Sequence, residues 1–213
     1  TTSSNATLVY STPSNIAPTI TQNLSAAKWA LANSSVDLIV IAAGTAPLIY
    51  QWYKNAQPIS GANQSKYTIT SLTSQTQGSY SVVISNSAGQ IESNTTSVNI
   101  GTAPNISTQP AGATIQIGKS VTLTVIATGA PNVLRYQWYK DNSPINNATN
   151  SSYAIASAAF EDAGNYYVSV TNDCGTTKST VVLLQNLDTL PIITTQPRGG
   201  YRALNAVSYT HLR

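Results

Sequence analysis

Apolar and polar residues alternate in short runs along most of the chain. The clearest run, YQWYK at residues 50–54, returns unchanged at residues 136–140. This alternation predicts β-strands with one buried face, because successive side chains of a strand point to opposite sides. Trp52 and Trp138 would then lie on the buried face, at the centre of two copies of one domain.

The pattern predicts the same series of strands twice, separated by turns rich in Gly, Pro, Asn and Ser. In the first copy the strands are expected at Val36–Ala42, Ile49–Tyr53, Tyr67–Thr70, Ser79–Ser85 and Ile91–Asn99. In the second copy they are expected at Ser120–Ala127, Leu134–Tyr139, Tyr153–Ala156, Asn165–Thr171 and Thr176–Leu184. No helical periodicity of useful length appears, and residues 26–32 are expected to replace an edge strand rather than form a helical turn.

A constant offset relates the two copies, since Trp138 lies 86 positions after Trp52. The same offset joins Pro58 to Pro144, Ile59 to Ile145, Tyr67 to Tyr153, Ile69 to Ile155, Gly78 to Gly164, Tyr80 to Tyr166, Val82 to Val168, Asn86 to Asn172 and Gly89 to Gly175. Many short strands with regular turns predict an all-β fold of two tandem β-sandwiches rather than a parallel α/β fold.

The repeat also predicts how the chain divides. One sandwich is expected at residues 15–101 and the other at 102–186, with short linkers at 101–103 and 186–191 that let the array bend. Residues 1–14 look like the last strand of a truncated preceding repeat, and residues 187–197 like the start of a third. Residues 198–213 break the pattern and are interpreted as a non-native tail.

Charge is scarce, at 8 % of residues against about 25 % in typical soluble domains. Three of the ten basic residues, Arg198, Arg202 and Arg213, lie in the predicted tail, and without them the basic residues equal the seven acidic ones. No basic stripe is left to hold phosphates, so nucleic acid is not an expected partner. No apolar run is long enough to predict membrane insertion.

The sequence offers no catalytic or metal-binding set. Its one histidine, His211, lies in the predicted tail, and its one cysteine, Cys174, allows no internal disulfide and no zinc site. We therefore expect no enzyme activity, no cofactor and no metal. Cys174 itself has two readings, an incidental turn residue or a thiol that is reactive or forms a covalent dimer.

Residues 162–168, DAGNYYV, resemble the Asp-x-Gly-x-Tyr-x-Cys signature of immunoglobulin-like domains. The run VTLTV at residues 121–125 stands where that family has its other half-cystine, and Trp138 matches the family's buried tryptophan. The chain is most similar to disulfide-free, I-set-like repeats of bacterial secreted or surface proteins. Such repeats carry a TQP start, a YQWYK strand and an SNSAG hairpin, here at residues 107–110 (STQP), 50–54 and 85–89.

The resemblance implies a structural core and departs from the antibody pattern in one respect. Valines replace both half-cystines of each pair: Val40 with Val82, and Val125 with Val168. Tyr80 and Tyr166 match the family's tyrosine corner, in which the hydroxyl bonds back to the backbone. Asp162 is expected to cap the turn before that strand, with Thr76 in the same role in the first repeat.

Two functional hypotheses remain open. The first is a non-catalytic extracellular segment that acts as a spacer and as an adhesion or protein-interaction module of a larger surface or secreted protein. The second is a carbohydrate-binding accessory module of an extracellular polysaccharide-acting enzyme. Tyr53 and Tyr139 point outward by strand alternation and are the candidate interaction residues, for a protein or a glycan. The alternative is that they only pair with neighbouring strands on an exposed sheet. Neighbouring repeats of the same chain are the other expected partners.

Overall fold

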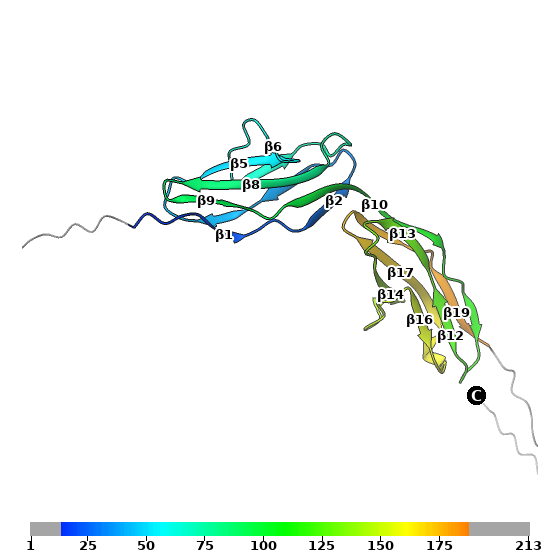
Figure 1. Cartoon of the computed structure of the whole chain (residues 1–213). Helices are drawn as coiled ribbons and strands as arrows, with labels where there is room; N and C mark the ends of the chain where they lie inside the picture. Colours follow the sequence, from blue (N-terminus) through cyan, green and yellow to red (C-terminus); the bar gives the residue numbers. More distant parts are fainter. Residues whose placement is uncertain (1–13, 188–213) are drawn as a thin grey trace, which may run out of the picture.

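The computed structural model describes residues 14–187, which form two β-sandwiches arranged end to end (Figure 1). The all-β architecture predicted from the sequence is confirmed. The predicted non-native tail lies outside the described residues, as do nearly all of the predicted third repeat at residues 187–197 and of the predicted fragment at residues 1–14.

The first sandwich contains the following strands: β1 (Thr19–Gln22), β2 (Ala27–Leu31), β3 (Val36–Ile39), β4 (Ile41–Ala43), β5 (Ile49–Lys54), β6 (Gln57–Pro58), β7 (Lys66–Ile69), β8 (Gly78–Asn86), β9 (Gly89–Glu92) and the first part of β10 (Thr96–Thr108). One layer holds β10, β8, β5 and β6, with β2 beside β10 and β9 beside β8. The other layer consists of the pairs β1–β4 and β3–β7.

The second sandwich repeats this plan. Its elements are β11 (Ala113–Ile115), β12 (Val121–Thr124), β13 (Ile126–Ala130), β14 (Arg135–Lys140), β15 (Ser143–Pro144), β16 (Ser152–Ile155), the 3-10 turn η1 (Phe160–Asp162), β17 (Gly164–Asn172), β18 (Gly175–Lys178) and β19 (Val182–Asn186). One layer has the order β11, β19, β17, β14 and β15, with β18 beside β17. The remaining pairs are β12–β16 and the second part of β10 with β13.

Each sandwich has its own hydrophobic core. One buried cluster includes Leu38, Trp52 and Val82, and the other includes Leu123, Trp138 and Val168. The cross-strand registers match, because Trp52 faces Val82 and Trp138 faces Val168 on the neighbouring strand. The two halves therefore do not merge into one interior.

Four of the predicted strand runs are interrupted in the structure. Residues 120–127 divide into β12 and β13, because the chain changes partner from β16 to β10 near Val125. Residues 36–42 divide into β3 and β4, because the chain changes partner from β7 to β1 near Val40. Residues 91–99 divide into β9 and β10, and residues 176–184 divide into β18 and β19. Ser93 and Ser179 lie at these two breaks, where each hydroxyl accepts a bond from the Val82 or Val168 amide at 3.0 Å. Residues 27–31 form no helical turn; they are themselves a strand, β2, which lies beside β10.

Strand β10 corrects the predicted linker at residues 101–103, because it runs without interruption through those positions. Its residues 97–101 pair with β2 of the first sandwich, and its residues 102–108 pair with β13 of the second. One strand thus serves as the last strand of one sandwich and the first strand of the next. The position of the boundary along β10 stays a prediction.

Candidate functional site

The predicted core residues lie inside the sandwiches. Trp52 and Trp138 are both 0 % exposed. Each indole N–H donates a hydrogen bond to a backbone carbonyl, that of Gln64 at 2.8 Å and that of Asn150 at 2.9 Å. A buried indole needs such an acceptor, so these bonds fix the ring orientation as well as its burial.

The four valines predicted in place of half-cystines are buried as well. Val40 and Val82 belong to the first core cluster, and Val125 and Val168 belong to the second. Their exposed fractions do not exceed 2 %. Each pair shares a core with one tryptophan, so burial of aliphatic surface stabilises the place where the family resemblance implied a disulfide.

The hydroxyls of Tyr80 and Tyr166 bond back to the chain four residues earlier. Tyr80 donates to the carbonyl oxygen of Thr76, and Tyr166 donates to that of Asp162 at 2.8 Å. The Asp162 carboxylate accepts a bond from the Ala159 amide at 2.8 Å, which caps the turn before β17. In the first sandwich the Thr76 hydroxyl accepts the corresponding bond from the Thr73 amide at 2.7 Å.

Burial changes the acidity of both corner tyrosines. Burial, with a smaller effect of the neighbouring Tyr67, raises the pKa of Tyr80 to about 12. Burial also raises the pKa of Tyr166, with smaller effects of Tyr153 and of nearby carboxylates. Both phenols therefore stay neutral and act as hydrogen-bond donors at ordinary pH.

Tyr139 lies on the outer face of its sheet, opposite Tyr167 on the neighbouring strand. The two rings are stacked, with centroids 4.8 Å apart and planes 6° from parallel. The Lys178 ammonium lies 5.3 Å from the centre of the Tyr167 ring. The second sandwich thus carries a packed stack of two rings and a cation on this face.

Tyr53 occupies the corresponding place in the first sandwich, but its surroundings differ. Ser81, not a tyrosine, lies opposite Tyr53 on β8. A hollow of about 570 Å³ opens beside the Tyr53 ring. Its walls are formed by Tyr53, Asn55, Ala56, Ser79, Tyr80, Ser81, Val83, Glu92 and Thr95.

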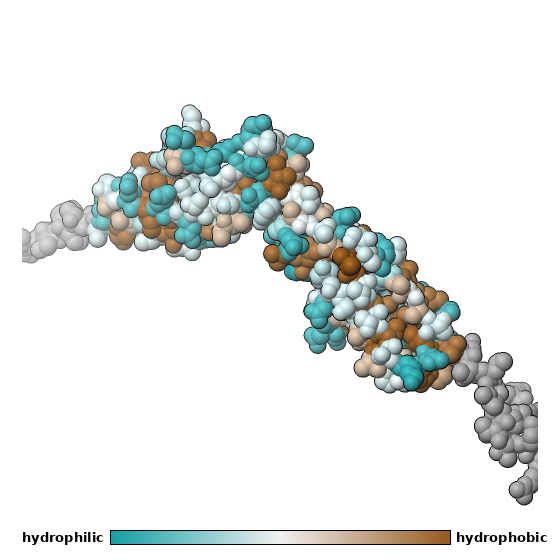
Figure 2. Space-filling model, turned by 45° about the vertical axis from the view of Figure 1, so that its right-hand side comes forward, coloured by the Kyte–Doolittle hydropathy of each residue, from teal (hydrophilic) through white to brown (hydrophobic). Residues whose placement is uncertain are grey.

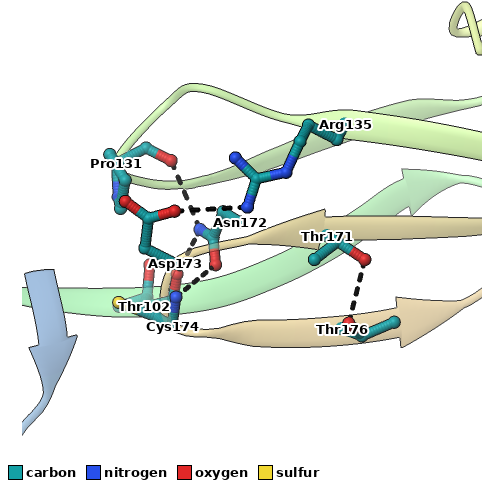
Figure 3. Close-up of polar contacts among 8 residues, drawn as sticks. All are labelled: Thr102, Pro131, Arg135, Thr171, Asn172, Asp173, Cys174 and Thr176. Atoms are coloured by element: carbon teal, nitrogen blue, oxygen red, sulfur yellow. Dashed lines mark hydrogen bonds and ion pairs between the residues drawn. The ribbon is translucent and has the colours of Figure 1, made fainter.

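The second candidate site is the junction between the sandwiches, where the hairpin that joins β17 and β18 lies against β10 (Figure 3). The Asn172 amide group donates to the carbonyl oxygens of Thr102 at 2.8 Å and Pro131 at 3.2 Å. Its carbonyl oxygen accepts from the Cys174 amide at 2.9 Å. Asn172 is only 3 % exposed, so its side chain ties three backbone segments together inside the junction.

Gly101 and Cys174 meet at the centre of this junction. A Cβ atom added at Gly101 would lie 2.3 Å from both the Ala130 carbonyl oxygen and the Cys174 sulfur. Only glycine leaves room for this approach of β10 to the hairpin. Cys174 is 9 % exposed, and burial, with a smaller effect of Asp173, raises the pKa of its thiol. The fold thus gives Cys174 a packing role rather than an exposed reactive position.

Asn86 makes the same set of bonds in the first sandwich. Its amide group donates to Ile16 at 2.7 Å and to Thr45 at 2.9 Å, and its oxygen accepts from the Ala88 amide at 2.8 Å. Asn86 is half-buried, whereas Asn172 is buried. In each sandwich this asparagine thus fastens the incoming strand to the hairpin. Asn172 is the more buried of the two, and it lies where β10 passes from the first sandwich to the second, close to Gly101 and Cys174.

Within residues 14–187, no three His, Cys, Asp or Glu side chains lie close enough together to hold a metal ion. The same residues include no helix that is long and apolar enough to cross a membrane. On the face shown in Figure 2, apolar and polar side chains are mixed along both sandwiches, without one dominant apolar area. The places with distinctive geometry are therefore the two tyrosine faces and the junction.

The second sandwich, with its buried tryptophan, tyrosine corner and two-layer topology, can be compared with known proteins. Residues 103–172 match the immunoglobulin domain family. The extracellular domains 3–5 of Drosophila OTK have the same fold as the immunoglobulin-like pair, with a TM-score of 0.50 and 22 % identity. That match covers 80 % of this chain and 62 % of the OTK chain. The prediction of two tandem immunoglobulin-like sandwiches is thereby confirmed.

Two curated relatives differ widely in origin. The muscle M-line assembly protein unc-89 of Caenorhabditis elegans is 32 % identical over 155 residues, which is 66 % of this chain and 2 % of that protein. The decoration protein of Escherichia phage T5 is 44 % identical over 62 residues, or 29 % of this chain and 38 % of that protein. The chain thus spans well under half the length of each of these relatives.

Sequence reasoning identified Asn86 and Asn172 only as a repeated pair and did not assign them a role. Their position in a hairpin, two residues before the tip at 88 or 174, was the available signal, because an Asn side chain often bonds to nearby backbone there. Gly101 lies in the linker that the repeat boundaries predict at residues 101–103. Its close contact with Cys174 depends on how the two sandwiches meet.

Proposed function

We propose that this chain is a non-catalytic extracellular segment of a larger surface or secreted protein of bacterial origin. In this role it acts as a spacer that sets the distance and direction between flanking parts, and as an adhesion or protein-interaction module. Two cores in series along one chain suit this role, because each sandwich folds around its own tryptophan.

The observation that carries the proposal is the junction through β10. A flexible linker would let the sandwiches move independently, but here one strand is hydrogen-bonded in both of them. The Asn172 bonds and the close approach at Gly101 add contacts that hold the direction of the strand. In a segment built in this way, the orientation of one sandwich limits the orientation of the other.

The composition of the chain and its relatives support an extracellular role in a bacterial protein. The chain is poor in charge and rich in neutral polar residues, as suits an extracellular surface. One structural neighbour consists of extracellular domains, and the relative with 44 % identity is a decoration protein of a phage that infects Escherichia. The resemblance to bacterial tandem repeats favours the same setting.

Small-angle X-ray scattering tests the spacer role. A matched variant with a five-residue Gly-Ser insertion between residues 101 and 102 keeps both cores but separates the two halves of β10. We expect the unmodified chain to show one narrow distribution of interatomic distances and the insertion variant a broader one. Equally broad distributions for both proteins would contradict the proposal.

The stacked rings of Tyr139 and Tyr167 favour a second candidate, a carbohydrate-binding accessory module of an extracellular polysaccharide-acting enzyme. A flat aromatic surface beside polar groups is suited to a sugar ring. Binding of the chain to insoluble glycans, lost in the Tyr139→Ala variant and kept in Tyr53→Ala, would support this role. No binding across a broad glycan panel would leave the spacer role as the proposal.

A further inference from the structure

The outer faces of the two sandwiches differ beside the outward-facing tyrosine. In the second sandwich the Tyr167 ring lies flat against Tyr139, with the ring centres 4.8 Å apart. In the first sandwich Ser81 stands where Tyr167 would be, and a hollow of about 570 Å³ lies beside Tyr53. The second sandwich is therefore a template for the first, and it shows that a flat group stacked on the tyrosine fits this place.

The charge next to this place is reversed between the two sandwiches. Lys178 reaches over Tyr167 in the second, whereas Glu92 stands at the corresponding position in the first and lines the hollow. Glu92 is exposed, and none of the ion pairs formed among residues 14–187 involves it. A group that enters the hollow would thus meet a carboxylate without a partner, which favours a cation.

We propose that the hollow beside Tyr53 binds the guanidinium group of an arginine side chain on a protein partner. A guanidinium is planar and stacks on aromatic rings, and it carries the charge that Glu92 complements. Its fork of N–H donors matches a carboxylate, and Ser81 and Thr95 add polar residues to the walls. This site extends beyond the spacer role and does not depend on it.

Titration of the ¹⁵N-labelled 213-residue chain with N-acetyl-arginine amide tests the site, with the amide signals of Ser81 and Val83 as the readout. We expect saturable shifts with a dissociation constant on the order of 1 mM, since one side chain supplies all the contacts. Ser81→Tyr fills the hollow with the ring found in the second sandwich, and binding should be lost. Glu92→Gln should weaken binding by about two- to fivefold.

Matched controls separate the site from general surface binding. Tyr53→Ala removes the stacking ring and should abolish binding of N-acetyl-arginine amide, so it tests the site even if Ser81→Tyr does not fold. Tyr139→Ala is the equivalent change in the second sandwich and should leave the affinity for N-acetyl-arginine amide unchanged. Wild-type affinity in Ser81→Tyr or Tyr53→Ala would overturn the proposal. So would the absence of saturable shifts, or equally tight binding of N-acetyl-tyrosine amide, because the site would then not select the charged planar group.

Discussion

Trp52 and Trp138 are fully buried, yet each indole N–H keeps a backbone acceptor from the loop after the next short strand. This explains why the residue type is tryptophan and not another large apolar residue. A phenylalanine would fill part of the volume but leave the carbonyl of Gln64 or Asn150 without its donor. At the residue scale, each core is thus held by burial and by one directed hydrogen bond.

The raised pKa values of the corner tyrosines make stability depend on alkaline pH. The folded protein holds the Tyr80 proton up to about pH 12, whereas an unfolded tyrosine loses it near pH 10. The folded state then binds more protons than the unfolded state in this window. The stabilisation is therefore complete below about pH 10 and is lost as the pH rises towards 12.

Urea unfolding followed by tryptophan fluorescence at several pH values between about 9 and 12 measures this effect. We expect the unfolding midpoint to fall across the window in the unmodified protein. The double variant Tyr80→Phe with Tyr166→Phe should start from a lower midpoint, because two hydrogen bonds are lost, but should fall less steeply. A slope as steep as that of the unmodified protein would contradict the assigned pKa direction.

At the element scale, strands on opposite layers meet at the valine positions, with Val125 just after β12 and Val168 within β17. The double variant Val125→Cys with Val168→Cys should oxidise to a disulfide in the folded protein. The oxidised form should exceed its own reduced form in free energy of unfolding by about 2–4 kcal/mol, as measured by urea denaturation.

The comparison of oxidised with reduced protein removes the effect of lost valine burial, which is common to both forms. The equivalent pair Val40→Cys with Val82→Cys in the first sandwich is the matched experiment. Thiols that stay free and accessible in folded protein would show that these strands do not face each other as the structure places them.

The asparagines at the hairpins provide a second test at this scale, because the same three bonds occur in two settings. Asn172→Ala removes the side-chain bonds to the Thr102 carbonyl, the buried Pro131 carbonyl and the Cys174 amide, and should destabilise the second sandwich by about 1–3 kcal/mol. Asn86→Ala should cost less, because Asn86 is half-buried and water can replace its bonds. Hydrogen exchange of amides in each core measures the two effects separately. Equal costs would indicate that the junction does not exclude water from Asn172.

At the scale of the whole molecule, the junction depends on a position that cannot accept a side chain. Gly101→Ala places a methyl group 2.3 Å from the Ala130 oxygen and the Cys174 sulfur, so β10 or the hairpin must move. We expect both cores to stay folded, with their tryptophan fluorescence unchanged, while the angle between the sandwiches changes or becomes variable.

Small-angle X-ray scattering and the NMR rotational correlation time of each sandwich measure this change. Ser97→Ala, an exposed change in the same strand, is the control and should leave both measurements unchanged. A scattering profile of Gly101→Ala that equals that of the unmodified protein would show that the close approach at Gly101 does not set the arrangement.

The sequence by itself determined the fold class, the two copies and the core residues. Alternation assigns Trp52 and Trp138 to a buried face, and the offset of 86 residues carries each assignment from one copy to the other. These are local properties, because a strand must alternate apolar and polar residues wherever one of its faces is buried. Six of the ten predicted runs therefore lie within one residue of observed strands, namely β5, β7, β8, β14, β16 and β17, whereas β1, β6, β11 and β15 were not predicted.

Only the tertiary structure decided how the copies are joined and where their surfaces differ. The continuity of β10 depends on partners far away in the chain, β2 on one side and β13 on the other, so residues 101–103 resembled a linker in the sequence. The hollow beside Tyr53 likewise exists because a side chain from another strand, Tyr167 in the second sandwich, has no counterpart in the first. Both features arise from contacts between strands, which alternation along one strand does not specify.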